Sequence, residues 1–216
     1  RTGGRGHKAR PKIWTEPEIL GGKKVKSSVV IIDTAGCFWV KVGGCSMCGY
    51  VQHQGPPDTA PDKQFLGLFK KRGPEKYVKI FNSGSFLDDS EVGPDKRAAI
   101  VEFCREQGVE KLVVESRPEL VTDERIESLK RAGGDMGLSV AMGLESSSDF
   151  VRRNCVNKGF DLKTYRKAAR TLNENGLGVK TYLLLKPPFL TENEAYLDAL
   201  AGIEEAAAFS QEISVN

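Results

Sequence analysis

Short apolar runs alternate with amphipathic segments along most of the chain. The apolar runs are typical of buried parallel strands, because both faces of such a strand are covered by other elements. We predict strands at 29–33, 77–82, 111–115, 139–143, 180–185 and 212–215. The pattern between them predicts helices at 62–71, 94–107, 122–132, 162–175 and 192–210.

Turn and capping residues support several of these boundaries. Pro94 begins one predicted helix and Gly108 follows its end, the positions that these two residues favour. Thr122, Asp161 and Thr191 each precede another helix and can cap its free amide groups. The helix boundaries are therefore encoded locally.

Repeated strand–helix units predict an α/β fold with a parallel sheet. A complete eight-fold barrel typically needs about 250 residues, and this chain has 216. We therefore predict a partial (β/α)6 barrel, with a doubly wound sheet as the competing architecture. In both folds the functional residues lie on loops at the carboxyl ends of the strands.

Composition and charge add a basic N-terminal segment to this description. Hydrophobic residues make up 39% of the chain and charged residues 28%, as in soluble globular proteins. No apolar run approaches the roughly 20 residues of a membrane span, and no signal peptide is recognisable. The first 26 residues carry eight Lys or Arg against two Glu, a charge of +6, which leaves −3 for the remainder.

We therefore predict a basic leader at 1–26 and a single domain at 27–216. The leader is either a contact surface for a polyanion such as RNA or a solvated tail. The last predicted strand is cut short by the end of the sequence, so we expect the domain to continue beyond residue 216.

Three of the five cysteines crowd into a glycine-rich loop directly after the first predicted strand. An odd, clustered set argues against extracellular disulfides and for a reducing, cytoplasmic compartment. Cys37, Cys45 and Cys48 could bind zinc with His53 as the fourth ligand. Cys45 and Cys48 alone could form a redox pair. All three could instead hold an iron–sulfur cluster with one open iron, which the position after a strand favours.

Polar motifs also follow the later strands. Asn82-Ser83-Gly84-Ser85-Phe86 follows the second, residues 115–119 (ESRPE) the third, residues 143–146 (GLES) the fourth and residues 186–189 (KPPF) the fifth. Because parallel strands end at the same edge of a sheet, we expect these motifs to surround the cysteine loop.

The cysteine loop resembles the cluster-binding motif of the radical S-adenosylmethionine (SAM) superfamily, with a longer first gap. The motifs at 84–86, 115–119 and 143–146 resemble the branch that contains the elongator catalytic subunit. Within that branch, residues 43–50 (GGCSMCGY), 157–160 (NKGF) and 185–190 (LKPPFL) are most similar to the radical SAM family of archaeosine biosynthesis. The resemblance covers nearly the whole chain.

The resemblance implies two cofactors, a [4Fe-4S] cluster held by Cys37, Cys45 and Cys48 and a SAM molecule on the open iron. The implied SAM contacts are Met47 at adenine, Asn82, Ser83, Gly84 and Ser85 at the amino group, Glu145 at ribose, and Glu115 and Arg117. The Asn82 turn replaces a Gly-Gly-Glu motif, so Asn or Ser oxygens and backbone carbonyls must serve in place of that glutamate. Glu115 and Arg117 could instead form a structural ion pair. Arg152, Lys158, Lys186 and Cys155 receive no assigned role, although Arg152 and Lys158 could bind a carboxylate or a phosphate.

The implied function is modification of a tRNA nucleoside. In the archaeosine family this is a lyase step that breaks a carbon–nitrogen bond of a lysine-bearing 7-deazaguanine. An electron donor such as ferredoxin or flavodoxin and a partner enzyme that prepares the base are implied as well. Two alternatives stay open: another elongator-like tRNA-modifying enzyme, or a zinc-stabilised RNA-binding module without enzymatic activity.

Overall fold

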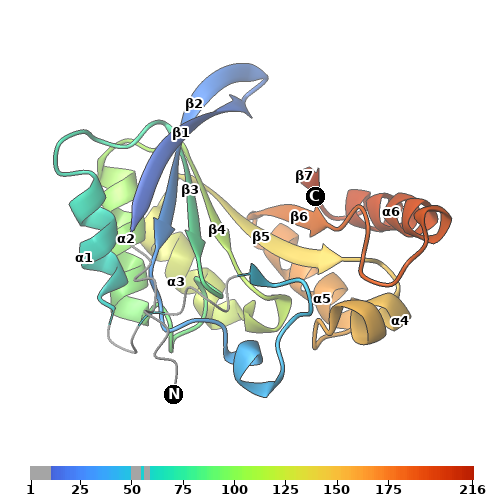
Figure 1. Ribbon diagram of the computed structural model, residues 1–216. Coiled ribbons are helices and arrows are strands. Elements are labelled where there is room, and N and C mark those ends of the chain that lie inside the picture. The colour runs from blue at the N-terminus through green and yellow to red at the C-terminus, as the bar shows by residue number, and fades with distance from the viewer. Residues whose placement is uncertain (1–10, 50–54, 56–58) are drawn as a thin grey trace.

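Six parallel strands follow one another in chain order across a curled sheet, as the computed structural model of residues 11–49, 55 and 59–216 shows (Figure 1). They are β2 (Lys23–Ile32), β3 (Tyr77–Asn82), β4 (Lys111–Glu115), β5 (Gly137–Glu145), β6 (Gly178–Leu183) and β7 (Glu212–Val215). A further strand, β1 (Lys12–Leu20), pairs antiparallel with β2 at one edge. The sheet curls into a half-barrel, which confirms the predicted fold class.

Helices connect the parallel strands and cover the convex face of the sheet. They are α1 (Pro61–Leu68), α2 (Pro94–Glu106), α3 (Asp123–Gly133), α5 (Leu162–Glu174) and α6 (Glu192–Ala207). Shorter turns are η1 (Phe38–Val42), η3 (Pro118–Leu120), α4 (Asp149–Val151) and the π-helical η4 (Arg152–Val156). In the described part of the chain, no helix has the length and apolarity needed to cross a membrane.

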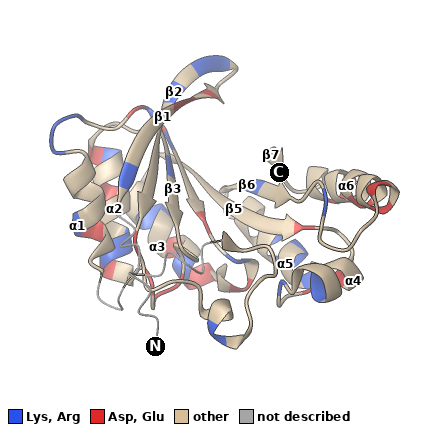
Figure 2. Ribbon diagram, in the orientation of Figure 1, with Lys and Arg blue, Asp and Glu red and all other residues tan. Residues whose placement is uncertain are grey.

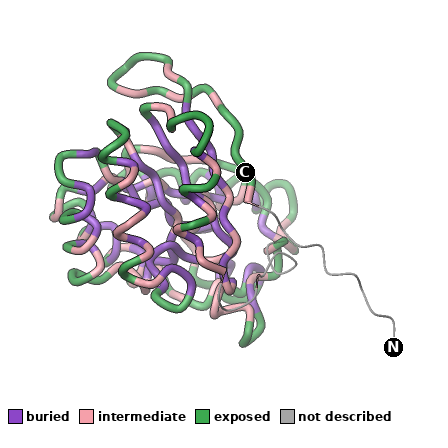
Figure 3. The backbone as a smooth tube through the Cα atoms, turned by 90° about the vertical axis from the view of Figure 1, so that its left-hand side faces the viewer, coloured by how far each residue is buried: buried purple, intermediate pink, exposed green. Residues whose placement is uncertain are grey.

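The main core lies between the sheet and these helices. Strand residues such as Val30, Ile80 and Leu112 are fully buried there against helix residues such as Ile100 and Ile126. Figure 3 shows the buried strands enclosed by partly exposed helices. A smaller apolar cluster of Tyr77, Val113 and Ala141 lies apart from it. The side chains of the strands alternate between the two faces, as the pleat of a sheet requires.

Most predicted elements agree with the structure in position. The bounds of β3, β4 and β7 are those expected from the sequence, and the helix starts at 94, 162 and 192 also agree. Three strands begin earlier than predicted: β2 at Lys23, β5 at Gly137 and β6 at Gly178. These strands begin with polar residues or glycine. The apolar run from which each strand was predicted therefore starts a few residues after the strand begins.

The N-terminal segment differs most from expectation. From residue 12 onward it forms β1 and the start of β2, joined by Gly21 and Gly22, and is not a solvated tail. Both glycines have positive φ angles, 56° and 74°, as a two-residue hairpin turn requires. The hairpin tip extends past the rest of the sheet (Figure 1). Residues 1–10 of the predicted leader lie outside the described residues.

The hairpin is fastened to the sheet by a buried lysine on β3. Lys79 Nζ lies 2.7 Å from Glu16 Oε2 and 2.6 Å from Glu18 Oε1, both on β1. Only 7% of the Lys79 side chain is exposed. Burial lowers the pKa of Lys79, but the bonds to the two carboxylates outweigh it and raise the pKa overall. Glu16 and Glu18, the two acidic residues of the predicted basic leader, thus bind a lysine of the sheet.

Replacing Lys79 by methionine is expected to lower the free energy of unfolding by about 2 kcal/mol, because two neighbouring carboxylates lose their shared cation. Urea denaturation measures the change. Adding Glu16→Gln and Glu18→Gln to Lys79→Met removes the unpaired charges and should restore most of the loss. No recovery in the triple variant would contradict the described ion pairs.

Candidate functional site

The cysteine loop lies at the carboxyl ends of the parallel strands, directly after β2. Cys37, Cys45 and Cys48 are free thiols and are half-buried. The Cys37 amide donates to the Ser83 carbonyl at 3.3 Å, which ties the loop to the turn after β3. On the other side Ser46 donates through its amide to Val156 and through its hydroxyl to the Cys155 carbonyl, at 2.9 and 2.7 Å. The loop is therefore anchored on two sides.

Burial raises the pKa of the Cys37 and Cys45 thiols, while the nearby positive charge of Arg117 acts in the opposite direction on both. Within the described residues, no three His, Cys, Asp or Glu side chains converge on a point where one metal ion could bind. A four-iron cluster does not need such convergence, because each thiolate binds a different iron. His53, the ligand considered for zinc, lies outside the described residues.

A cavity of about 440 Å³ adjoins the cysteine loop, a size typical of small-molecule sites. Seven of the site residues expected from the sequence line this cavity: Cys45, Met47, Cys48, Gly84, Glu115, Arg117 and Glu145. Lys158, Tyr182 and Phe81 also line it. Cys37 and the predicted Asn82, Ser83 and Ser85 are absent from its described wall, and the latter three are buried beside Gly84. The structure thus gathers residues from four separate strand ends.

Glu145 ends β5 and forms a buried ion pair inside the cavity wall. Its Oε1 accepts from Lys158 Nζ at 2.7 Å, and 7% and 12% of the two side chains are exposed. The backbone of Glu145 has a positive φ of 67° and follows an irregularity in the β5–β6 register. A Cβ at Gly143 would lie 2.3 Å from Glu145 Oε1, so only glycine leaves room for this carboxylate.

Glu115, at the end of β4, keeps a proton more readily than an ordinary glutamate. Burial raises the pKa of Glu115 to about 7, although a hydrogen bond from Tyr182 and the charge of Lys158 oppose the shift. Glu115 does not pair with Arg117, the structural alternative expected from the sequence. Arg117 instead pairs with Glu119, because the chain turns away after β4 into η3.

This pKa predicts a pH-dependent stability for the cofactor-free protein. The unfolded chain releases the Glu115 proton near pH 4.5, whereas the folded chain retains it up to about pH 7. The folded state binds more protons across this window, so the free energy of unfolding should fall as pH rises, by about 2–3 kcal/mol. Urea denaturation between pH 4.5 and 8 should show this decrease in the wild-type protein. In Glu115→Gln the part of the decrease that comes from Glu115 should be absent.

The exposed Glu110→Gln variant is the control for this experiment, since its carboxylate lies on the surface near Lys76. It should retain the pH dependence of wild type. A Glu115→Gln profile that matches wild type would contradict the assignment of the proton to Glu115.

Arg117 fastens the cysteine loop to the segment after η4. Its guanidinium lies 5.3–5.5 Å from the ring centres of Phe38, Trp39 and Phe160 and donates to the Lys158 carbonyl at 2.8 Å. Such cation–π contacts favour a fixed arrangement of the rings. Arg117 therefore touches both the loop and the far wall of the cavity.

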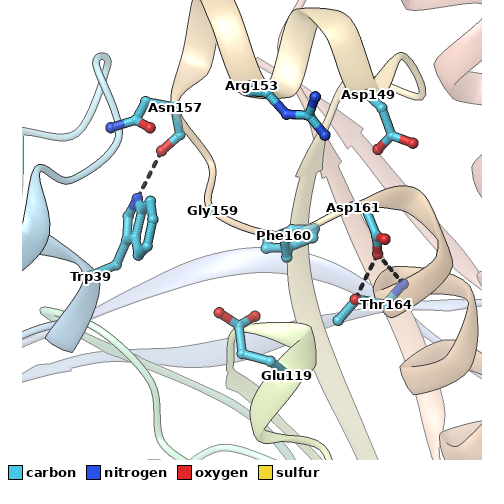
Figure 4. A pocket seen from close by; sticks show the side chains of 9 residues that line it. All are labelled: Trp39, Glu119, Asp149, Arg153, Asn157, Gly159, Phe160, Asp161 and Thr164. Carbon is cyan, nitrogen blue, oxygen red and sulfur yellow. Dashed lines mark hydrogen bonds between the residues drawn. The ribbon is translucent and has the colours of Figure 1, made fainter.

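A second cavity of about 480 Å³ is lined by Trp39 and Phe160, two of the rings that Arg117 contacts (Figure 4). Trp39 forms one wall, and its indole donates to the Asn157 carbonyl at 2.7 Å. A Cβ at Gly159 would lie 2.5 Å from the same indole, so the ring rests directly on the glycine backbone. Phe160, Glu119 and residues of α4 and α5 complete the wall.

Glu91 is a site residue that the sequence analysis did not single out. Its buried carboxylate accepts from Thr34 Oγ1 at 2.5 Å, Asn82 Nδ2 at 3.0 Å and the Ser85 amide at 2.8 Å. Burial raises the pKa of Glu91 against these bonds. Glu91 thus joins the start of the cysteine loop to the Asn82–Ser85 turn. This is the turn that stands in place of the Gly-Gly-Glu motif and lacks its glutamate. Its position nine residues after Asn82, in a polar loop, offers no local signal of this role.

The structure also shows the positions of Arg152, Lys186 and Cys155, to which the sequence assigned no role. Arg152 is buried and pairs with Asp149 and the Ser146 carbonyl. Lys186 pairs with Glu192 at the surface. Cys155 lies on η4 in a small cluster against which Cys45 packs. Arg152 and Cys155 therefore support the site from outside the first cavity.

Comparison with known proteins identifies the family. The profile described as "Radical SAM superfamily" matches residues 31–200, from the end of β2 into α6. The chain belongs to the radical SAM superfamily. Radical SAM proteins use a [4Fe-4S] cluster and SAM, so these are the cofactors that the site must accommodate.

Two similar curated proteins share a name. Archaeosine synthase subunit beta of Methanosarcina acetivorans is 40% identical over 94% of this chain and 60% of its own length. The protein of that name from Thermococcus kodakarensis is 36% identical over 94% of this chain and 65% of its own length. The chain thus spans about three fifths of the relatives it matches.

Solved structures of similar fold include methylornithine synthase, with a TM-score of 0.61 at 13% identity over 86% of this chain and 52% of that one. An Elp3 from Methanocaldococcus infernus with an N-terminal deletion has a TM-score of 0.53 at 13% identity, over 87% and 45% of the two chains. At these identities the likeness concerns the fold, the half-barrel of the superfamily.

The site fits the two cofactors on its own chemistry. Three thiols stand on one anchored loop, and two of them border a cavity that also holds carboxylates from β4 and β5. Gly143, which has no Cβ, lets the Glu145 carboxylate and the Lys158 ammonium group lie against the end of β5 in the cavity wall. Carboxylates and an ammonium group at the wall can bond the hydroxyl, amino and carboxylate groups of SAM.

Proposed function

We propose that this protein is a radical SAM enzyme that modifies a nucleoside of tRNA. The observation that carries the proposal is the common cavity of Cys45, Cys48, Glu115 and Glu145 at the mouth of the half-barrel. When bound, the cluster and SAM supply a one-electron cleavage of the sulfonium whose product abstracts a hydrogen atom from the substrate. The protein binds and orients both partners and limits access of water.

The proposed roles follow the positions of the side chains. Cys37, Cys45 and Cys48 hold the cluster, and Met47 packs near adenine. Among the described residues Lys158 bonds Glu145 through Oε1, and we assign Oε2 to a ribose hydroxyl. The turn of Asn82, Ser83, Gly84 and Ser85 receives the amino group of SAM through its backbone, held in place by Glu91. Glu115 bonds the cofactor, and Arg117 acts as a positioning residue.

The narrower proposal is the lyase step of archaeosine formation, and the name of the two relatives supports it. The substrate would then be a lysine-bearing 7-deazaguanine in tRNA, in which a carbon–nitrogen bond is cleaved. An electron donor such as ferredoxin or flavodoxin and an enzyme that prepares the base are the proposed partners. A reducing, cytoplasmic compartment suits the thiols of the site.

Anaerobic purification of the full-length protein tests the proposal. Iron and sulfide in a ratio typical of one four-iron cluster, with formation of 5′-deoxyadenosine under dithionite, support a radical SAM enzyme. Mass spectrometry of nucleosides from tRNA that carries the lysine adduct then tests the lyase step. Stoichiometric zinc without SAM cleavage would favour the RNA-binding module and overturn the enzyme. Unchanged tRNA despite SAM cleavage would overturn only the lyase step.

A further inference from the structure

Four cationic side chains stand on one face of α5. They are Lys163, Arg166, Lys167 and Arg170, at positions i, i+3, i+4 and i+7, which share one side of a helix. Together with Thr171 and Glu174 they line a surface hollow of about 440 Å³. We call these four residues the α5 basic face.

This concentration of charge is not a property of the whole domain. Residues 27–216 carry a net charge of −3, with 24 basic and 27 acidic residues. The neighbouring α6 lies in a stretch, 187–216, without any Lys or Arg, and Figure 2 shows it with acidic residues only. Like charges one turn apart repel each other by about 0.2–0.5 kcal/mol per pair. An anionic partner would remove this cost.

The charges are partly held in place. Arg166 forms two bonds with Glu205, at 2.7 and 2.5 Å, and the Arg170 guanidinium lies 5.6 Å from the centre of the Phe209 ring. Lys163 and Lys167 are exposed and have no ion pair with any described residue. Two oriented cations therefore alternate along the helix with two that are available to a ligand.

The face also leads toward the cysteine loop. Thr164, in the first turn of α5, lines the second cavity together with Trp39 and the exposed Arg153 (Figure 4). Trp39 belongs to η1, which starts one residue after Cys37. A polyanion along α5 would therefore reach the rim of the candidate active site.

We propose that the α5 basic face binds the phosphate backbone of the RNA substrate, an inference that rests on the proposed function. The apolar side of α5, with Tyr165, Ala168 and Leu172, is buried in the core, so it has no apolar face to insert into a membrane. Lysine is depleted at the centres of protein–protein interfaces, whereas exposed lysines are typical phosphate contacts. An RNA backbone is the partner that this chemistry suits.

The experiment measures affinity of the cluster-loaded, full-length protein for a tRNA transcript at several salt concentrations. The test variant is Lys163→Gln with Lys167→Gln. The control is Lys130→Gln with Arg131→Gln, which removes the same charge from exposed positions on α3. We expect the test variant to bind about tenfold more weakly near 0.1 M salt and to reduce the slope of log affinity against log salt by about 1–2. The control should match wild type.

Cluster content and SAM cleavage without RNA should be unchanged in both variants, which shows that each is folded. Wild-type affinity and slope in the test variant would overturn the α5 assignment and leave the proposed function intact. An equal loss in the α3 control would also overturn it, because the effect would then reflect net charge alone. A wild-type protein that binds no tRNA would instead overturn the RNA substrate itself.

Discussion

Replacing Cys45 by alanine is expected to abolish the iron–sulfur cluster and, with it, all cleavage of SAM. Two thiolates, those of Cys37 and Cys48, would remain in the loop, and they cannot hold a cluster that needs three protein ligands. Iron and sulfide analysis, the visible absorption of the cluster and 5′-deoxyadenosine formation measure the result.

Cys104→Ala is the matched control for this prediction. Cys104 is fully buried on α2 in the main core, and burial raises the pKa of its thiol to about 12. Its replacement should lower the free energy of unfolding by about 1 kcal/mol and leave cluster and activity intact. A Cys45→Ala protein with full iron, sulfide and SAM cleavage would contradict the assignment of the ligands.

Gly159→Ala is expected to destabilise the protein by about 4 kcal/mol, the sum of left-handed strain and overpacking. Gly159 has a φ of 82°, and an added Cβ would lie 2.5–2.8 Å from three atoms of the Trp39 indole. The indole cannot move away freely, because it is bonded to Asn157 and faces Arg117. Urea denaturation measures the loss of stability.

Gly176→Ala separates the two contributions. Gly176 has a similar φ of 76°, but nothing lies within 4 Å of its added Cβ. This variant should lose only about 1–2 kcal/mol, the strain of the backbone. Equal losses at the two positions would show that Trp39 does not rest on Gly159. A larger loss at Gly159 would also show how firmly the cysteine loop is docked.

The strands and their order were predictable because buried parallel strands appear in the sequence as short, nearly continuous apolar runs. β3 and β4 are short, nearly continuous apolar runs, and their bounds agree with prediction. The β1–β2 hairpin was missed although Gly21-Gly22 is a recognisable two-residue turn signal. Pro17 and charged residues interrupt the apolar positions of β1, which is the largely exposed edge strand, and the first half of β2 is polar and exposed as well.

The candidate site was predictable only as a set of loops. Cys45, Cys48, Glu115 and Glu145 meet at one cavity because each follows a parallel strand, and parallel strands end together. Partners that lie away from strand ends could not be found in this way. Glu91 comes from a loop with no motif of its own, and Lys158 belongs to the 157–160 motif, to which the sequence assigned no role. Their bonds to the Asn82 turn and to Glu145 depend on how those loops fold back.

The sequence by itself determined the order of the strands and helices and placed the cysteine loop directly after a strand, because strand periodicity and residue spacing are local properties of the chain. Only the tertiary structure decided that Arg117 pairs with Glu119 and three aromatic rings, and that Lys158 holds Glu145. It also brought Glu91 beneath the turn that lacks the expected glutamate. These contacts join residues distant in the chain, and the balance of burial and charge that selects them exists only in the folded protein.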